Sequence, residues 1–544
     1  KSIRNTFSNR CFDDGIDTFF NHKVPFSYST GSILANRFCS LIKTYIKSTK
    51  KSAITLLELG AGSGKLSHEI LSILAKDPQT ASVSITLLIT DSNPVLIKQM
   101  QAQYTHNSQI MYKCFNPLTD SYSTLASFDI AIMCYLLDCL DTYHLEVDNG
   151  KFYEWKITSY IDNTDYLITS SKQKLKYYDA KTLSKYILKL NSNESSLKLS
   201  HCIKESFKRF ELPTTHELYK HKLATEILSK NKTSAPHKFN LSIDSLDCIN
   251  KLTRQLNTSQ MAIIFDFGTP NNKSLSTRKN SYKATYGMCN FYSISFPHLH
   301  YLATKHNVFF EQTEFKKGES QCLMLHRLKS NTAIRSTFKQ AFNTPGNTRL
   351  NTTFKQIKSY SARKTKQLSI SAYITKKLLT LSEFEKKDYE FNIRLCEILI
   401  DHKHYEHAHY NLDILIKSEP KFSRSAYFLK AKLFQLENKP KQVIELVNKL
   451  NLHSLKHSGI LYQYCLSLCK CEKYKEFETF FYRFLQHSDY FIPWRFFIIL
   501  HYIFSIKTKQ TKLINLNQFL SLILKENPSL IHSEIIDTIK NLLP

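Results

Sequence analysis

The sequence has no apolar run long enough to cross a membrane as a helix. Such a run needs about 18 consecutive apolar residues, and none occurs among the 544 residues of the chain. The most apolar region, 490–504, is interrupted by Pro493, Arg495 and His501. We therefore expect no membrane contact and interpret 490–504 as a buried helix.

Cysteine pairs with the spacing of a metal site are also missing. The 13 Cys residues are scattered without a C-x-x-C pair, and Cys469 and Cys471 are too close together for a standard zinc knuckle. This pattern is typical of reduced thiols in the core of a cytoplasmic protein. We predict a cytoplasmic location and no metal.

Acidic residues are few, and the chain carries a formal net charge of +28. From Ser320 to Ser382 there is no Asp or Glu, whereas Lys and Arg together number twelve. We predict that 329–382 is an irregular or partly ordered basic linker and the best local candidate for contact with nucleic acid or an acidic partner. A solvated linker and a general lysine excess from AT-rich coding are the alternatives, and the sequence leaves them open.

Three closely spaced glycines stand out in a chain that has only 11. Residues 56–65 read LLELGAGSGK between the apolar run Ala53–Leu57 and an amphipathic run from Leu66, which predicts a strand, a glycine turn and a helix. The G-x-G-x-G spacing lets a ligand approach the backbone. Glu58 at the end of the strand would repel an anion and favours a cationic ligand. The alternative is an empty turn of another Rossmann-like fold.

A second predicted strand, Ser84–Thr90, ends at Asp91. A carboxylate at the tip of the second strand of a doubly wound fold accepts hydrogen bonds from a ribose diol. Capping of the following helix is the alternative role of Asp91, and the two roles are compatible.

The glycine stretch resembles motif I of the class I S-adenosylmethionine-dependent methyltransferases, whose loop holds the amino acid end of the cofactor. Together with residues 91–96 (DSNPVL) and 136–140 (LLDCL), it is similar to the MidA family. This family includes the mitochondrial complex I assembly factor that is a protein arginine methyltransferase. The resemblance covers roughly residues 10–328. It implies a Rossmann-like α/β domain over 1–328 with a helical insertion at about 174–230. The cofactor-binding residues that we infer are Glu58, Gly60, Ala61, Gly62, Gly64, Asp91, Ser92 and Asn116.

The substrate half of this resemblance is altered. The family's Asn-Glu is Cys134-Tyr135 here, its Thr-x-Pro-Glu appears as Tyr28–Gly31, and its His-Val-Asp-Phe becomes Ser293–Phe296. A guanidinium needs carboxylates to orient it, and two are missing from the expected places. Asp138 and Asp266 remain as catalytic candidates. A helix cap or a salt bridge at the core edge is an equal alternative for each.

Beyond residue 383 the pattern is helical and repeats. His404–Ala408 aligns with Lys439–Val443 and with Lys473–Phe477, at offsets of 35 and 34 residues. This helix-turn-helix period resembles the tetratricopeptide repeat. We predict a repeat domain over 383–544 that binds a protein partner, with a plain helical domain as the alternative.

These features together favour an S-adenosylmethionine-dependent methyltransferase that acts on a protein, with arginine as the acceptor implied by the MidA resemblance. A degenerate methyltransferase fold that serves as a scaffold is the second hypothesis, because the substrate half is altered. RNA methylation is the third, and only the charge supports it.

Overall fold

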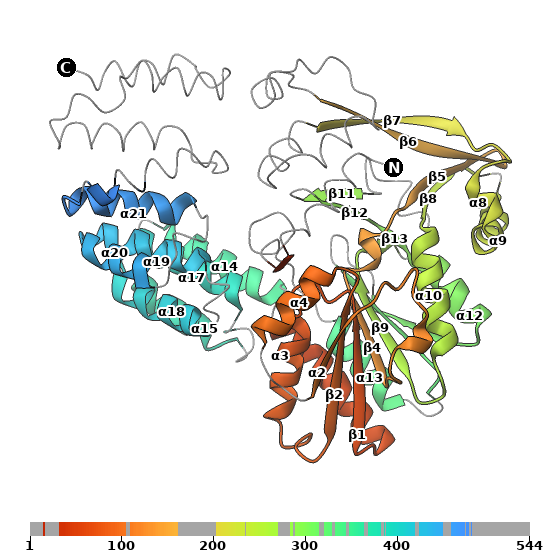
Figure 1. Ribbon diagram of the computed structural model, residues 1–544, viewed down its shortest axis with the longest axis horizontal. Helices are drawn as coiled ribbons and strands as arrows, with labels where there is room; N and C mark the ends of the chain where they lie inside the picture. The colour runs from red at the N-terminus through yellow and green to blue at the C-terminus, as the bar shows by residue number, and fades with distance from the viewer. Residues whose placement is uncertain are drawn as a thin grey trace. The chain divides into compact units, whose positions relative to one another are not determined.

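The chain divides into two compact units, 1–160 with 205–351 and 161–204 with 352–544. The computed structural model (Figure 1) describes residues 15–16, 32–104, 109–161, 203–233, 235–269, 283–286, 289–314, 320–328, 332–343, 348–363, 368–381, 386, 388–418, 424–449, 458–473, 475–477 and 480. Three parts of the sequence predictions lie outside these residues: Tyr28–Gly31, the insertion up to residue 202, and the apolar region 490–504.

The first unit is built on a seven-stranded mixed sheet in the order β14-β15-β9-β4-β1-β2-β3. The strands β3, β2, β1, β4 and β9 run parallel, and β15 is antiparallel to both of its neighbours. This is a Rossmann-like arrangement, as predicted. The strands are β1 Ala53–Leu59, β2 Ser84–Asp91, β3 Ile110–Cys114, β4 Ile130–Cys134, β9 Met261–Asp266, β14 Phe309–Gln312 and β15 Gln321–His326.

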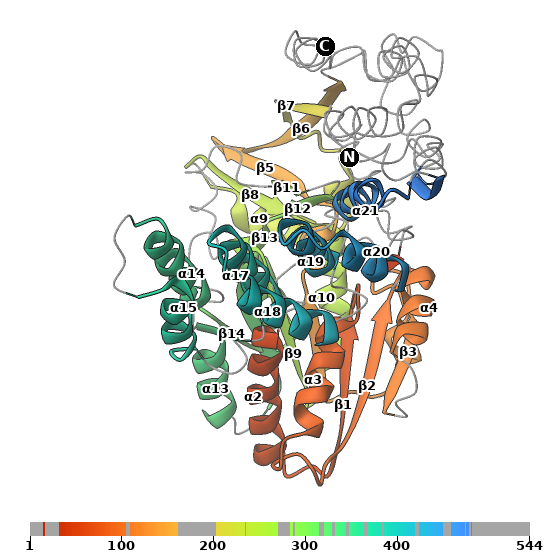
Figure 2. The same ribbon diagram turned by 90° about the vertical axis from the view of Figure 1, so that its left-hand side faces the viewer.

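Helices cover both faces of this sheet, which is why its central strands are apolar almost throughout. Every residue of β9 is buried. Helix α2 (Ser32–Thr49) packs against α3 (Lys65–Ala75), and α10 (Ile243–Gln255) packs against α12 (Phe296–Lys305). The two pairs lie on opposite faces of the sheet (Figures 1 and 2).

A second sheet, in the order β7-β6-β5-β8, belongs to the same unit. Its strands are β5 Tyr143–Asp148, β6 Lys151–Ile161, β7 Ile203–Glu211 and β8 His237–Leu241. Asn149 and Gly150 join β5 to β6 with φ of 49° and 75°, the left-handed pair that a two-residue hairpin turn requires.

The helical insertion predicted at about 174–230 is wrong at residues 203–211. Residues 203–211 form strand β7, because β6 offers them a hydrogen-bonding edge. The residues that follow are helical, in the short α8 (Glu217–Lys220) and in α9 (Lys222–Asn231).

The irregular linker predicted at 329–382 is also wrong where the structure describes it. Helices α13 (Thr332–Asn343), α14 (Thr348–Ser361) and α15 (Ile370–Leu378) occupy it. Helix α13 packs against α2 and buries Ile334, Phe338 and Phe342. The helical spacing of these few apolar side chains outweighs the basic composition.

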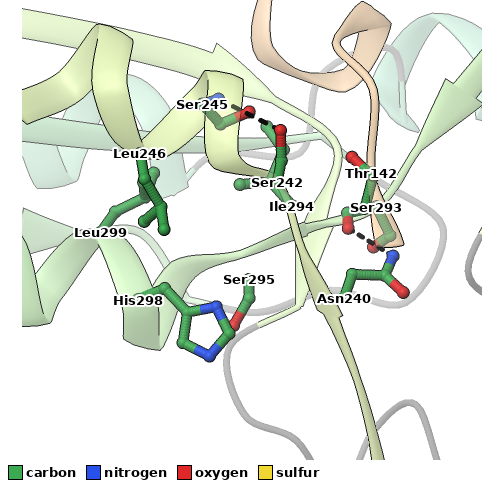
Figure 3. A pocket seen from close by; sticks show the side chains of 10 residues that line it. All are labelled: Thr142, Asn240, Ser242, Ser245, Leu246, Ser293, Ile294, Ser295, His298 and Leu299. Atoms are coloured by element: carbon green, nitrogen blue, oxygen red, sulfur yellow. Dashed lines mark hydrogen bonds between the residues drawn. The ribbon is translucent and has the colours of Figure 1, made fainter. Parts of the chain in front are cut away.

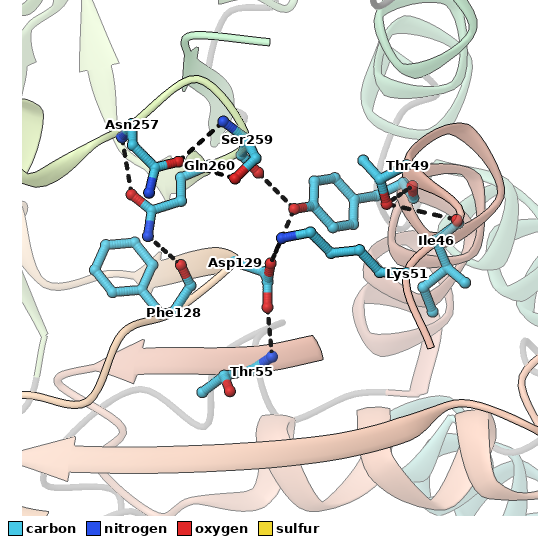
Figure 4. A network of polar contacts seen from close by, with 10 residues as sticks. Ile46, Thr49, Lys51, Thr55, Phe128, Asp129, Asn257, Ser259 and Gln260 are labelled. Carbon is cyan, nitrogen blue, oxygen red and sulfur yellow. Dashed lines mark hydrogen bonds and ion pairs between the residues drawn. The ribbon is translucent and has the colours of Figure 1, made fainter. Parts of the chain in front are cut away.

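A polar network joins α2 to the amino ends of the central strands (Figure 4). The Asp129 carboxylate, just before β4, accepts hydrogen bonds from the Thr55 N–H at 2.7 Å and from the Tyr45 hydroxyl at 3.1 Å, and it pairs with Lys51. Ligands bind at the opposite, carboxyl ends of such strands, so this network stabilises the fold rather than serving chemistry.

The second unit contains these successive helices: α17 (Tyr389–Asp401), α18 (Tyr405–Ser418), α19 (Arg424–Leu436), α20 (Pro440–Lys449) and α21 (Ser458–Lys470). Each packs against the next. The aligned positions Ala408, Val443 and Phe477 are all buried. None of the helices in the described residues has the length and apolarity needed to span a membrane.

Candidate functional site

The glycine loop connects β1 to α3. Gly60, Gly62 and Gly64 have φ of 71°, 58° and 71°, the left-handed region that strains other residues. A Cβ atom on Gly60 would lie 2.8 Å from Leu136 Cδ1, and one on Gly64 would lie 2.5 Å from Met100 Sδ. The loop therefore needs glycine for its conformation and for its packing.

Asp91, the last residue of β2, is bonded to this loop. Its Oδ2 accepts the Gly62 N–H at 3.0 Å, and its Oδ1 accepts the Asn93 N–H at 2.9 Å. The cap of α4 (Pro94–Gln103) is Asn93, whose side chain accepts the Val95 N–H. Asp91 is therefore not the helix cap. It ties the glycine loop to the second strand, and burial raises its pKa even though backbone N–H groups bind its charged form.

Glu58 lies beside the loop, one residue before the end of β1, and is only 3% exposed. Its Oε2 is buried with no hydrogen-bond partner among the described residues. Burial raises the pKa of Glu58 to about 7; the Ser67 hydroxyl lowers this pKa and the charge of Asp91 raises it. A buried carboxylate oxygen without a partner is costly, so the site fits a cationic group such as an ammonium.

Ser92 and Asn116 complete the residues predicted for the cofactor. Ser92 is exposed directly after Asp91. The carboxamide oxygen of Asn116 accepts the Leu118 N–H, and the Asn116 N–H donates to Asp120, both at 2.9 Å, so Asn116 shapes a local turn. Because β1, β2 and β3 are parallel neighbours, all the predicted cofactor residues gather at one edge of the sheet. There β1 lies between β2 and β4, at a topological switch point.

Asp138 and Asp266, the catalytic candidates, meet at the carboxyl ends of β4 and β9 and are fully buried. Asp138 belongs to the 3-10 helix η4 (Leu137–Cys139). Asp266 Oδ2 accepts the N–H groups of Leu137 at 3.0 Å and of Asp138 at 3.4 Å, while its Oδ1 accepts the Phe267 N–H at 2.8 Å. Asp266 thus caps η4 from the neighbouring strand, which agrees with the cap alternative for this residue.

Asp138 and Asp266 differ in whether a carboxylate oxygen is left without a hydrogen-bond partner. Asp138 Oδ2 is buried and has no partner in the described part of the chain. Burial raises the pKa of Asp138 to about 7, and burial together with the Asp138 charge raises the pKa of Asp266 well above its usual range. Two neighbouring buried carboxyls cannot both ionise readily, so the pair retains a proton near neutral pH.

A small polar pocket adjoins η4, since the Ser245 hydroxyl donates to the Leu137 carbonyl at 3.4 Å (Figure 3). Its cavity of about 10 Å³ has room for roughly one water molecule. Of the segments that line this pocket, the sequence analysis singled out only Ser293–Phe296, because the other lining residues lie far from it in the sequence. The lining residues are Thr142, Asn240, Ser242, Ser245, Leu246, Ser293, Ile294, Ser295, His298 and Leu299.

Residues 33–288 match the family described as "Putative S-adenosyl-L-methionine-dependent methyltransferase". The match spans slightly less than half of the chain and includes every predicted cofactor residue and both aspartates. It supports a methyltransferase of the S-adenosylmethionine-dependent kind, with S-adenosylmethionine as the cofactor. No curated protein sequence matches the chain.

Solved structures show only low similarity. A Burkholderia thailandensis protein bound to S-adenosyl-homocysteine has a TM-score of 0.36 at 10% identity, over 55% of this chain and 77% of that chain. A second structure from the same organism has a TM-score of 0.37 at 10% identity, over 61% of this chain and 89% of that chain. The structure of human N-acetylserotonin methyltransferase in complex with SAM has a TM-score of 0.26 at 8% identity, over 54% of this chain and 52% of that chain. Similarity at this level carries no argument about function.

Proposed function

We propose that this chain transfers a methyl group from S-adenosylmethionine to a protein substrate. The observation that carries the proposal is the unpaired buried oxygen of Glu58, next to a glycine loop that is itself bonded to Asp91. The carboxyl ends of β1 and β2 thus bring together three features. Glu58 can accept hydrogen bonds from an ammonium, the glycine loop has no side chains that shield its backbone, and Asp91 can accept hydrogen bonds from hydroxyl groups.

Each of these groups fits one part of the cofactor. Glu58 would hold the ammonium of its amino acid end, and the glycine backbone would allow close approach. Asp91 would accept the ribose hydroxyls, because its two oxygens offer about four lone pairs, more than the backbone N–H groups of Gly62, Ser92 and Asn93 use. The sulfonium supplies the activated methyl group, so the protein's own contribution is to bind, orient and exclude water.

Asp138 is the group we propose for proton transfer. With an unpaired oxygen and a pKa raised to about 7 by burial, its carboxylate is suited to take a proton from the methyl acceptor. Asp266, whose oxygens bind three backbone N–H groups, would position it. Because Asp138 is fully buried, the substrate must open a path to it.

Calorimetric titration with S-adenosylmethionine and S-adenosylhomocysteine tests the cofactor site. We expect micromolar binding of both, weakened in Asp91→Ala by about 1–3 kcal/mol through loss of the ribose contact. Asn93→Ala is the matched control, because it removes the α4 cap and leaves the carboxylate in place. Absence of binding by the folded protein at millimolar ligand would favour the scaffold hypothesis instead.

The protein substrate is proposed from the helical unit and from its resemblance to tetratricopeptide repeats, with arginine as the acceptor suggested by the MidA resemblance. Deleting 383–544 is expected to leave a folded, cofactor-binding domain that no longer methylates its protein substrate. Transfer of a labelled methyl group to proteins of a cell extract would be compared between the full chain and the deletion variant. An insoluble truncation would show instead that these helices support the fold. Label in RNA would favour the basic 329–382 segment as the binding surface.

A further inference from the structure

We propose that the pocket between the starts of α10 and α12 is a carboxylate-binding subsite. It lies in the first unit at the carboxyl end of the central sheet. Residues Ile294–Ser295 form strand β13, which pairs with β10 (Gly268–Thr269) immediately after Asp266. The pocket is therefore close to the proposed acceptor side and separate from the Glu58–Asp91 edge.

Two helix N-termini converge on this pocket. Helix α10 has 13 residues and contributes Ser242, Ser245 and Leu246, its cap and first turn, while α12 has 10 residues and contributes His298 and Leu299 from its first turn. The first N–H groups of a helix have no partner within that helix and carry a partial positive charge. A pocket walled by two such ends favours a negatively charged oxygen.

Ser295 supplies an observation independent of the helix ends. It is the cap residue of α12, yet its side chain makes no capping hydrogen bond, in contrast to Ser242, which accepts the Ser245 N–H at 3.1 Å. Ser295 is only 4% exposed, and its hydroxyl has no partner among the residues described. It lines the pocket beside His298 (Figure 3). A buried hydroxyl of this kind lacks the hydrogen bond that a ligand oxygen would provide.

The remaining lining also favours an anion. None of the ten lining residues is acidic, and five of them carry a hydroxyl group. Asp141 is next to the pocket in the chain, but its contribution there is the backbone carbonyl that accepts the Ser242 hydroxyl. Asp244 lies in the first turn of α10 without lining the pocket.

His298 adds a neutral ring to the pocket. Burial lowers the pKa of His298 to about 3, so its ring is neutral at pH 7. Its Nε2 lies 3.5 Å from the Asn231 side-chain nitrogen. If Nε2 accepts that hydrogen bond, the ring proton is on Nδ1, which then acts as a donor.

The size of the cavity limits the ligand. With room for about one water molecule, it admits one oxygen of a carboxylate whose remainder stays outside. In the proposed methyltransferase the pocket would select substrates that carry a carboxylate. That use rests on the proposed function, whereas carboxylate binding does not.

Broadening of the NMR signal of ¹³C-formate by the full chain, without S-adenosylmethionine, tests the site. N-acetylglycine is titrated in parallel, because binding of both probes indicates a chain terminus and binding of formate alone indicates a free small carboxylate. We expect Ser295→Ala to weaken binding about tenfold, the loss of one hydrogen bond to a charged group. We expect Ser295→Asp to abolish it by charge repulsion. Ser467→Ala is the control, since Ser467 is equally buried in the helical unit.

Circular dichroism checks that Ser295→Asp folds, because its carboxyl group would be buried. Thr142→Asp is the second variant, which places a charge on the half-buried rim of the pocket and should also abolish binding. No formate binding by the folded protein, or unchanged binding in both Asp variants, would overturn the subsite. The assay omits the cofactor, so failure of methyl transfer would leave this result unaffected.

Discussion

Replacing Gly62 by Arg is expected to abolish binding of S-adenosylmethionine, with at least about a hundredfold loss of affinity, or some 2.7 kcal/mol. Gly62 has φ of 58°, where a side chain is strained, and its N–H is held by Asp91. The guanidinium would enter the space that the loop leaves for the ligand, and it would pair with the carboxylates of Glu58 and Asp91. Calorimetric titration of the variant measures the effect directly.

Gly150→Arg provides the matched control for this result. Gly150 also has a left-handed φ, 75°, but it lies in the β5–β6 turn, where an added Cβ would meet only Lys232 Cε, at 3.9 Å. This variant should lose about 1–2 kcal/mol of stability through backbone strain and keep its cofactor affinity. Unchanged affinity in Gly62→Arg would refute the assignment of the glycine loop.

Replacing Asp266 by Ala is expected to lower the free energy of unfolding of the first unit by about 3–5 kcal/mol. The N–H groups of Leu137, Asp138 and Phe267 would lose their acceptor in a fully buried place, and each such loss costs about 1–3 kcal/mol before relaxation. Urea unfolding can be followed by the fluorescence of Trp155 in a Trp494→Phe background, so that the signal comes from this unit. A loss below about 1 kcal/mol would show that the backbone finds other partners.

Asp138→Asn is the companion variant, and its effect should depend on pH. The folded-state pKa of Asp138, about 7, is above the ordinary value near 4, so the protonated form stabilises the fold. This stabilisation is fully present below about pH 4 and is lost as pH rises toward 7. Asn cannot ionise, so the variant should show a shallower decline than the wild type over this range. Glu58, Asp91 and Asp266 also have raised pKa values, so the variant keeps part of the dependence of stability on pH. An identical pH profile would contradict the raised pKa of Asp138.

Local patterns in the sequence were sufficient wherever neighbours along the chain make the structure. The strand, glycine turn and helix over 53–75 and the strand that ends at Asp91 were predicted and are present. The helices of the second unit were predicted as well. Their signals are hydrophobic periodicity and turn residues, which act within about ten residues.

The predictions failed where a distant partner decides the conformation. Helix α13 is stabilised by packing against α2, where it buries three apolar side chains. Residues 203–211 form a strand because they pair with β6. Asp91 looked equally suited to cap α4. Only the structure shows that Asn93 has that role and that Asp91 binds the glycine loop across 29 residues of sequence.

The sequence by itself determined the proposed cofactor edge of this protein: the three glycines, the carboxylate before them and the carboxylate that ends the next strand. These elements are fixed by chain order, because successive parallel strands present their carboxyl ends together. Tertiary structure alone decided the arrangement of the proposed acceptor side. It brought Asp138 to Asp266 across 128 residues and joined the starts of α10 and α12 around Ser295. Burial and unpaired polar atoms give those residues their chemistry, and neither property exists until the chain has packed.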